Sequence, residues 1–214
     1  SPTEGIKIGK QICRYVQPLK DEDGNFINET RAVLPRILQH LLKARKDTRK
    51  KIPGEEDPFK RFVLDGLQLA YKITCNSLYG QVGASTSQIY KKEIAASTTA
   101  TGRRLLKLAK DNTEEKFQGN IKIDINGNIR EVFTKTDCVY GDTDSIFVRF
   151  KLTDPITNKE IEGKEALPIC IELGKLAGKD VTKQLKPPHD LEYEKTFWPF
   201  ILFSKKRYAG HLYE

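Results

Sequence analysis

The chain has 214 residues, which is enough to bury a hydrophobic core in one domain or in two small ones. Charged residues make up 31% of it and the formal net charge is +8, a balance that indicates an anionic partner, nucleic acid or nucleotide before a membrane. No apolar run is long enough to span a membrane and no signal peptide opens the chain, so we expect no membrane association.

The cysteines indicate the redox state of the protein, and the absence of methionine bears on whether the sequence is complete. The four cysteines are too far apart in sequence for a metal knuckle, so we expect reduced thiols of an intracellular protein. Because the sequence contains no Met and starts with Ser, we also expect it to be a portion of a longer protein, cut at both ends.

Two helices are expected in the first half of the chain, after a short apolar run over residues 12–16, strand or irregular, and a turn over residues 21–25. The first helix has an apolar face and a strongly basic far end, where Arg45 and Arg49 lie four residues apart on one side. Residues 52–58 contain two prolines and a glycine, which break it. The second helix is expected over residues 59–79, and the two helices should pack antiparallel.

The second half of the chain mixes strands and helices. Asn126-Gly127 lies between alternating residues, which is a strong hairpin signal. The expected elements, in chain order, are a helix over 94–110, hairpins over 121–133 and 139–150, a helix over 165–185, and strands over 190–195 and 197–203. This order predicts an α+β fold with a helical projection.

A strand, a tight turn and a second strand are expected around Asp142 and Asp144, which would lie together at the tip. Two ionised carboxylates side by side repel each other unless a cation neutralises them. Mg²⁺ prefers oxygen ligands and often takes one or two carboxylates plus substrate phosphates. The pattern therefore indicates a magnesium site, with an acidic hairpin turn on a solvated edge as the structural alternative.

One stripe of the second helix has the chemistry of a triphosphate site. Lys72 supplies a point charge, Asn76 a neutral donor and Tyr79 a flat ring for a base or sugar. Arg45 and Arg49 of the first helix would add donors for the same phosphates. The alternative is an ordinary solvated helix face.

The last predicted strands carry charge of both signs. The run Lys205, Lys206, Arg207 and Tyr208 suits contacts to a nucleic-acid backbone, and a basic surface patch is the alternative. Glu192 and Glu194 should point to one face of their strand. Either could supplement the aspartates, although a solvated strand face is the preferred interpretation for Glu192.

These segments together resemble the family B DNA polymerases: Tyr140-Gly-Asp-Thr-Asp-Ser145, Lys72-x-x-x-Asn76-Ser-x-Tyr79-Gly80, and Lys205-Lys-Arg-Tyr208. Leu34-Pro35 leading to Arg45-Lys46, and Asp57-Pro-Phe-Lys-Arg61, are similar to the fingers of that family. The resemblance covers nearly the whole chain. The stretches 95–102 and 190–197 look most like the polymerases of large nucleocytoplasmic DNA viruses, mimivirus-like ones in particular, with eukaryotic delta-type polymerases as relatives.

The resemblance implies a two-helix antiparallel fingers projection on a palm, whose antiparallel β-sheet is backed by helices. Residues 1–32 would form a palm-side entry segment, 33–82 the fingers and 83–214 an incomplete palm. It implies a DNA-directed DNA polymerase that transfers a nucleotide from a dNTP to a primer 3′-hydroxyl with two Mg²⁺ ions, in viral DNA replication.

Individual roles follow from the same resemblance. Asp144 would be the metal-bridging catalytic carboxylate, Asp142 its supporting neighbour and Glu194 an accessory group near the metals. The incoming dNTP would be bound by Arg45, Arg49, Lys72, Asn76 and Tyr79, and the primer–template DNA by Lys205, Lys206, Arg207 and Tyr208.

The chain departs from the family pattern in one respect. The family needs a second catalytic Asp, in an Asp-x-x-Ser-Leu-Tyr-Pro segment, and this sequence does not contain that segment. The exonuclease and thumb regions are also missing, so we expect the 214 residues alone to be inactive. Alternatives are an inactive polymerase-like scaffold that binds nucleic acid, an RNA-templated polymerase, and a soluble α+β domain with a basic face.

Partners and location also follow from the resemblance. A sliding clamp is a further expected partner of the full enzyme. The expected location is a viral factory in the host cytoplasm for a viral protein, or the nucleus for a cellular one.

Overall fold

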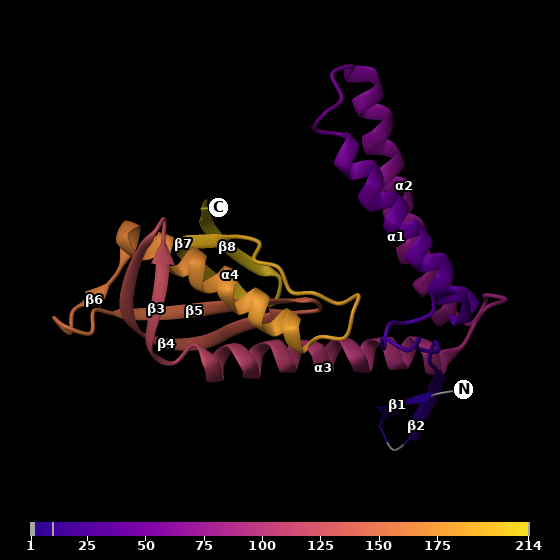
Figure 1. Cartoon of the computed structure of the whole chain (residues 1–214), viewed down its shortest axis with the longest axis horizontal. Helices are drawn as coiled ribbons and strands as arrows, with labels where there is room; N and C mark the ends of the chain where they lie inside the picture. The colour runs from indigo at the N-terminus through magenta and orange to yellow at the C-terminus, as the bar shows by residue number, and fades with distance from the viewer. Residues whose placement is uncertain (1–2, 10, 214) are drawn as a thin grey trace. The chain divides into compact units, whose positions relative to one another are not determined.

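The structure is a computed structural model, and it describes residues 3–9 and 11–213. The chain forms two compact units that divide between Thr101 and Gly102, inside the long helix α3 (Lys92–Lys116). Helices and antiparallel sheets are mixed along the chain (Figure 1), which confirms the predicted α+β class. Within the part that the structure describes, no helix is long and apolar enough to cross a membrane.

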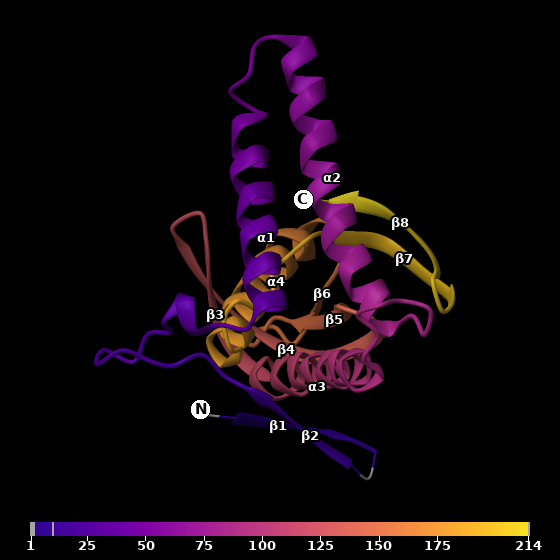
Figure 2. The same ribbon diagram turned by 90° about the vertical axis from the view of Figure 1, so that its right-hand side faces the viewer.

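The first unit contains the helix pair α1 (Val33–Lys51) and α2 (Pro58–Gly83), which lie side by side in both views (Figures 1 and 2). Asp57 begins α2, because its carboxylate accepts hydrogen bonds from the amides of Phe59 at 2.9 Å and Lys60 at 3.4 Å. Pro58 at the first helical position has no amide that needs a partner. Both predicted helices are confirmed, and α2 continues beyond its expected end at residue 79.

A small hairpin precedes these helices. Strand β1 (Thr3–Ile8) pairs antiparallel with β2 (Gln11–Val16), and a short 3-10 helix, η1 (Asn28–Thr30), follows. The Tyr15 hydroxyl lies 2.7 Å from the Ser97 hydroxyl and donates to the Glu93 carbonyl at 3.0 Å. These bonds attach the hairpin to the first turns of α3.

The second unit is built on a four-stranded antiparallel sheet in the order β3–β4–β5–β6. The strands are β3 (Gly119–Ile125), β4 (Asn128–Asp142), β5 (Ser145–Thr153) and β6 (Glu160–Ile161). Asn126 and Gly127 join β3 to β4 with φ values of 54° and 86°, as a two-residue turn with positive φ at both positions requires.

Strand β4 belongs to both predicted hairpins, whereas the sequence suggested two separate pairs of strands. Residues 134–138 lie between the two expected hairpins, and Thr134 and Thr136 among them are fully buried. Their hydroxyls lie 3.2 Å apart, and that of Thr136 also donates to the Phe117 carbonyl, so each finds a polar partner inside the fold. Tertiary hydrogen bonds therefore continue the strand through a segment of low apolar content.

Helix α4 (Ala166–Gln184) follows the short 3-10 helix η2 (Gly163–Glu165) and packs on the sheet (Figure 1). One buried face recurs every four residues, at Ile169, Leu173, Ala177 and Val181. The core it forms with the sheet includes Phe117, Ile123, Val132, Leu152 and Ile161. A further hairpin, β7 (Thr196–Ser204) with β8 (Arg207–Tyr213), closes the described chain.

The predicted strand over residues 190–195 is wrong. This segment has no strand pairing, and it lies along α4. The Leu191 amide donates to the Thr182 hydroxyl at 2.8 Å, and that hydroxyl donates to the Leu191 carbonyl at 3.2 Å. Partly buried Leu191 and Tyr193 do alternate with exposed Glu192 and Glu194, as predicted. Their inward side packs on helix α4, however, and not within a sheet.

Candidate functional site

The tip of the β4–β5 hairpin holds the two aspartates as predicted. Asp142 is the last residue of β4 and pairs with Ser145, so Thr143 and Asp144 form the loop. The Asp144 amide donates to the Asp142 carbonyl at 2.6 Å across Thr143, whose φ is 56°. A bond over one residue with positive φ is the pattern of a strained γ-turn, and a β-branched residue rarely adopts it. Such strain persists where the surrounding fold determines the conformation.

Lys206 forms an ion pair with Asp142. Its ammonium Nζ lies 2.5 Å from Asp142 Oδ2, and Thr143 Oγ1 donates to Asp142 Oδ1 at 3.0 Å. The hydrogen bond from Lys206 lowers the pKa of Asp142, and the same bond raises the pKa of Lys206. The side chain of Lys206 is 71% exposed, so solvent screens this pair strongly.

The donor set at the tip fits a hard cation. Asp144 is exposed. The hydrogen bond with Asp142 is the main cause of the raised pKa of Lys206, and the charge of Asp144 contributes to it. Two carboxylates on one turn supply the oxygen ligands that Mg²⁺ prefers. Among the described residues, no group of three or more His, Cys, Asp or Glu side chains is arranged to hold a metal. Glu194 is exposed, with its carboxylate 3.5 Å from Lys195 Nζ, so its metal role stays a prediction.

An aromatic cluster joins the β7–β8 hairpin to the β4–β5 hairpin. The Phe147 ring lies 4.9 Å from that of Tyr208, 5.4 Å from that of Phe200 and 5.7 Å from that of Tyr140, between centroids. The Tyr140 hydroxyl also accepts a hydrogen bond from the Lys206 amide at 2.9 Å. The cluster therefore brings the tips of two hairpins together, and Lys206 reaches Asp142 across 64 residues of sequence.

The remaining basic residues of this tip are open to solvent. Lys205 and Arg207 flank Lys206 and are exposed. The Tyr208 ring is half-exposed, with one side in the aromatic cluster. Of the four predicted nucleic-acid contacts, two remain exposed cations, one pairs with a carboxylate and one anchors the hairpin.

The predicted nucleotide-binding residues lie in the first unit. Lys72, Asn76 and Tyr79 are exposed along α2, and Arg49 is exposed on α1. Arg45 Nε donates to Gln68 Oε1 at 3.4 Å, and Gln68 lies one helical turn before Lys72. The structure therefore places Arg45 beside the start of the polar stripe of α2.

Two polar partners at this stripe are absent from the sequence prediction. Gln68 lies four residues before Lys72, as Lys72 lies four residues before Asn76. This spacing places all three on one side of the helix, so the sequence does contain a signal for Gln68. Thr99 lies on α3 with its hydroxyl 3.1 Å from that of Tyr79, and no local pattern indicates this contact.

The chain is similar to DNA polymerases of family B. The family model described as DNA polymerase family B matches residues 6–214. The DNA polymerase of Pyramimonas orientalis virus is 42% identical over 97% of this chain and 19% of its own length. That of Phaeocystis pouchetii virus is 47% identical over 85% of this chain and 16% of its own length.

A cellular relative is also similar. The DNA polymerase delta catalytic subunit of Candida albicans is 37% identical over 89% of this chain and 17% of its own length. The chain spans less than a fifth of the length of each of these relatives.

Proposed function

Because this chain belongs to DNA polymerase family B, we propose that it is the fingers and part of the palm of a template-directed DNA polymerase. The reaction joins the primer 3′-oxygen to the α-phosphorus of a dNTP and releases pyrophosphate. The observation that carries the proposal is the β4–β5 tip, where a strained turn presents two carboxylates and Asp142 forms an ion pair with Lys206. Residues 1–32 are assigned to the palm-side entry, 33–82 to the fingers and 83–214 to the palm.

The two aspartates are the proposed metal ligands. Asp144 would be the main ligand of the two Mg²⁺ ions, Asp142 would support the site, and Glu194 would act near it. When bound, such ions stabilise the negative charge on the attacking and leaving oxygens. The chain contributes the exposed carboxylate of Asp144 and a pKa of Asp142 that Lys206 holds low, so Asp142 is ionised at neutral pH.

Lys206 has a second proposed task. In the described structure its ammonium offsets the charge of Asp142, which limits carboxylate repulsion within the turn. Together with exposed Lys205 and Arg207 it would contact the phosphate backbone of primer–template DNA, and Tyr208 would hold the hairpin against the sheet.

The helix pair of the first unit is proposed to bind the dNTP. Lys72 and Asn76 point a cation and an amide donor to solvent on α2, and Arg45 lies beside this stripe through Gln68. Arg45, Arg49 and Lys72 would neutralise the triphosphate, while Tyr79 would lie under the nascent base pair. The similarity to two algal virus polymerases supports a role in viral DNA replication.

Primer extension by the complete polymerase tests the proposal. Asp144→Asn should abolish extension while DNA binding, measured by fluorescence anisotropy, stays close to wild type. The matched control is Asp111→Asn, because Asp111 is exposed on α3, where it forms a surface ion pair with Lys107 at 3.7 Å. Retained extension by Asp144→Asn would remove the catalytic role from this residue.

The 214-residue chain by itself is expected not to extend a primer with Mg²⁺. It contains no Asp-x-x-Ser-Leu-Tyr-Pro segment to complete the proposed metal site. Clear extension by this chain alone would contradict the assignment of Asp142 and Asp144 as one part of a larger ligand set.

A further inference from the structure

Strand β4 continues well past the end of its neighbour β3. The last β3–β4 pair is Gly119 with Thr134, whereas β4 runs on to Asp142. On the β5 side, pairing persists to the hairpin tip. The edge of β4 that β3 leaves open therefore leads directly to the proposed metal ligands.

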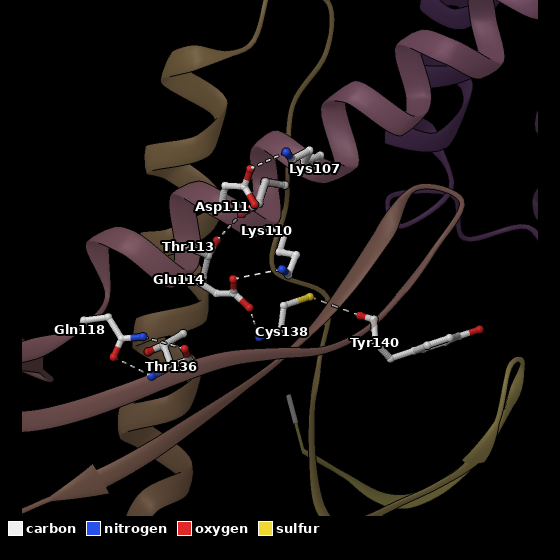
Figure 3. Close-up of polar contacts among 10 residues, drawn as sticks. Lys107, Lys110, Asp111, Thr113, Glu114, Gln118, Thr136, Cys138 and Tyr140 are labelled. Carbon is white, nitrogen blue, oxygen red and sulfur yellow. Dashed lines mark hydrogen bonds and ion pairs between the residues drawn. The ribbon is translucent and has the colours of Figure 1, made fainter. Parts of the chain in front are cut away.

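Side chains from the end of α3 and from the turn that follows it cover this open edge (Figure 3). The two-residue turn makes Ile125 and Asn128 a hydrogen-bonded pair, so every second amide from Asn128 onward faces β3. Thr136 and Cys138 are the next two amides on that edge after β3 ends. Each of them donates to a side-chain oxygen, from Gln118 or Glu114, at the place where a neighbouring strand would supply a carbonyl.

Gln118 and Glu114 provide these oxygens. Gln118 Oε1 accepts from the Thr136 amide at 3.2 Å and Gln118 Nε2 donates to the Thr136 carbonyl at 2.7 Å, so this side chain imitates a strand residue. Glu114 Oε1 accepts from the Cys138 amide at 2.9 Å. Glu114 lies in the last turn of α3, and Gln118 lies four residues further along, in the turn between α3 and β3.

The contact at Cys138 lies at the last regular position before a β-bulge. Cys138 pairs with Val148 and Tyr140 pairs with Phe147, so Val139 is the extra residue. Bulges re-aim the strand beyond them and are common next to active sites. A strand that slips by one residue turns every later side chain to the opposite face. The position of the bulge therefore decides which way Asp142 points.

Glu114 is itself held in place. Its Oε2 lies 3.3 Å from Lys110 Nζ one turn earlier, while Oε1 stays on the Cys138 amide. Hydrogen bonding to Glu114 raises the pKa of Lys110, as expected beside an ionised carboxylate. Beyond the bulge, α3 supports β4 again, because Leu106 would lie 3.4 Å from a Cβ added to Gly141.

We propose that Glu114 is a positioning residue for the Asp142–Asp144 turn, which it aligns by fixing the bulge through the Cys138 amide. Gln118 secures the strand two residues earlier. This inference rests on the proposed function, since alignment of the turn matters for nucleotidyl transfer only if the turn is catalytic.

Single-nucleotide incorporation by the complete polymerase tests the role of Glu114. Glu114→Ala should lower kcat about ten- to a hundredfold, because displacement of reacting groups by a mutation outside the site has effects of this size. KM for the dNTP should change little, and the Mg²⁺ concentration for half-maximal rate should rise. Glu114→Gln keeps Oε1 as an acceptor and should restore kcat to near wild type.

Two further variants complete the test. Glu115→Ala is the matched control, since Glu115 is the exposed neighbour on α3 and no hydrogen bond from it to β4 occurs among the described residues. Glu114→Asp keeps a charge near Lys110 but withdraws the carboxylate by one methylene, so kcat should fall as in Glu114→Ala. This variant carries the test if Glu114→Ala proves to be unfolded in a thermal melt.

Hydrogen exchange of the Cys138 amide gives a readout that does not depend on activity. Its protection should fall in Glu114→Ala and persist in Glu114→Gln. Equal kcat in Glu114→Ala and Glu115→Ala, an impaired Glu114→Gln, or unchanged exchange in Glu114→Ala would each overturn the inference. If Asp144→Asn extends primers like wild type, the proposed function fails instead, and the exchange measurement still decides whether Glu114 holds the bulge.

Discussion

Gly178 of α4 lies under the segment that replaces the predicted strand over residues 190–195. A Cβ added at Gly178 would lie 2.7 Å from the Leu191 carbonyl oxygen and 3.4 Å from the Tyr193 amide nitrogen. Both are backbone atoms that cannot rotate away. Gly178→Ala must therefore push the segment off the helix, which strains the two hydrogen bonds between Thr182 and Leu191.

Two opposing effects determine the size of the change in stability. Alanine favours the helix over glycine by about 1 kcal/mol. Overpacking a close contact costs about 1–3 kcal/mol, and each strained hydrogen bond at Leu191 contributes about 1 kcal/mol more when lost. The net expectation for Gly178→Ala is a loss of about 1–3 kcal/mol in the free energy of unfolding.

Gly102→Ala is the matched control, because Gly102 is a helical glycine of the same unit and an added Cβ there meets no atom within 4 Å. It should gain about 0.5–1 kcal/mol from helix propensity alone. Urea unfolding followed by the fluorescence of Trp198, the single tryptophan of the chain, measures both variants. An unchanged or raised stability of Gly178→Ala would refute the packing of residues 190–195 on α4.

Three more outcomes are expected. Lys206→Ala should raise the pKa of Asp142 towards 3.8 in a carboxyl NMR titration, while Lys205→Ala should leave that pKa unchanged. Because folding lowers the pKa of Asp142, its ionised carboxylate stabilises the fold above the pKa of the unfolded chain. This stabilisation is lost as the pH falls through the pKa of the folded chain. Burial raises the pKa of Cys170 to about 11, so iodoacetamide at pH 8 should leave Cys170 unmodified in the folded chain and modify it in urea, as mass spectrometry can show. Lys72→Ala in the complete polymerase should raise KM for the dNTP and lower kcat, and unchanged kinetics would return Lys72 to a solvated helix face.

The helices and the two turns of β4 could be predicted because their signals are local. Asp57-Pro58 marks the start of α2 by capping and proline placement, and Asn126-Gly127 defines its hairpin through backbone conformations that few residue pairs adopt. Asp142 and Asp144 were found for the same reason, since strand-forming residues flank a short polar tip.

The misjudged segments all depend on partners that are distant in sequence. Residues 134–138 lie between the two expected hairpins. They continue β4 because they pair with β5, while Gln118 and Glu114 bond to the edge that β3 leaves open. Residues 190–195 alternate like a strand, and they lie on α4 because Gly178 leaves room for a backbone there. Alternation shows which side chains are buried, but it does not show what buries them.

By itself the sequence determined the α+β class, the helix pair of the first unit and the residue types at the hairpin tip, since periodicity, capping and turn chemistry act over a few residues. The tertiary structure alone decided that Lys206 neutralises Asp142 and that Glu114 holds the strand leading to it. These contacts join residues 64 and 24 positions apart. Their formation depends on how an aromatic cluster and the helix α3 pack against β4, which no local pattern records.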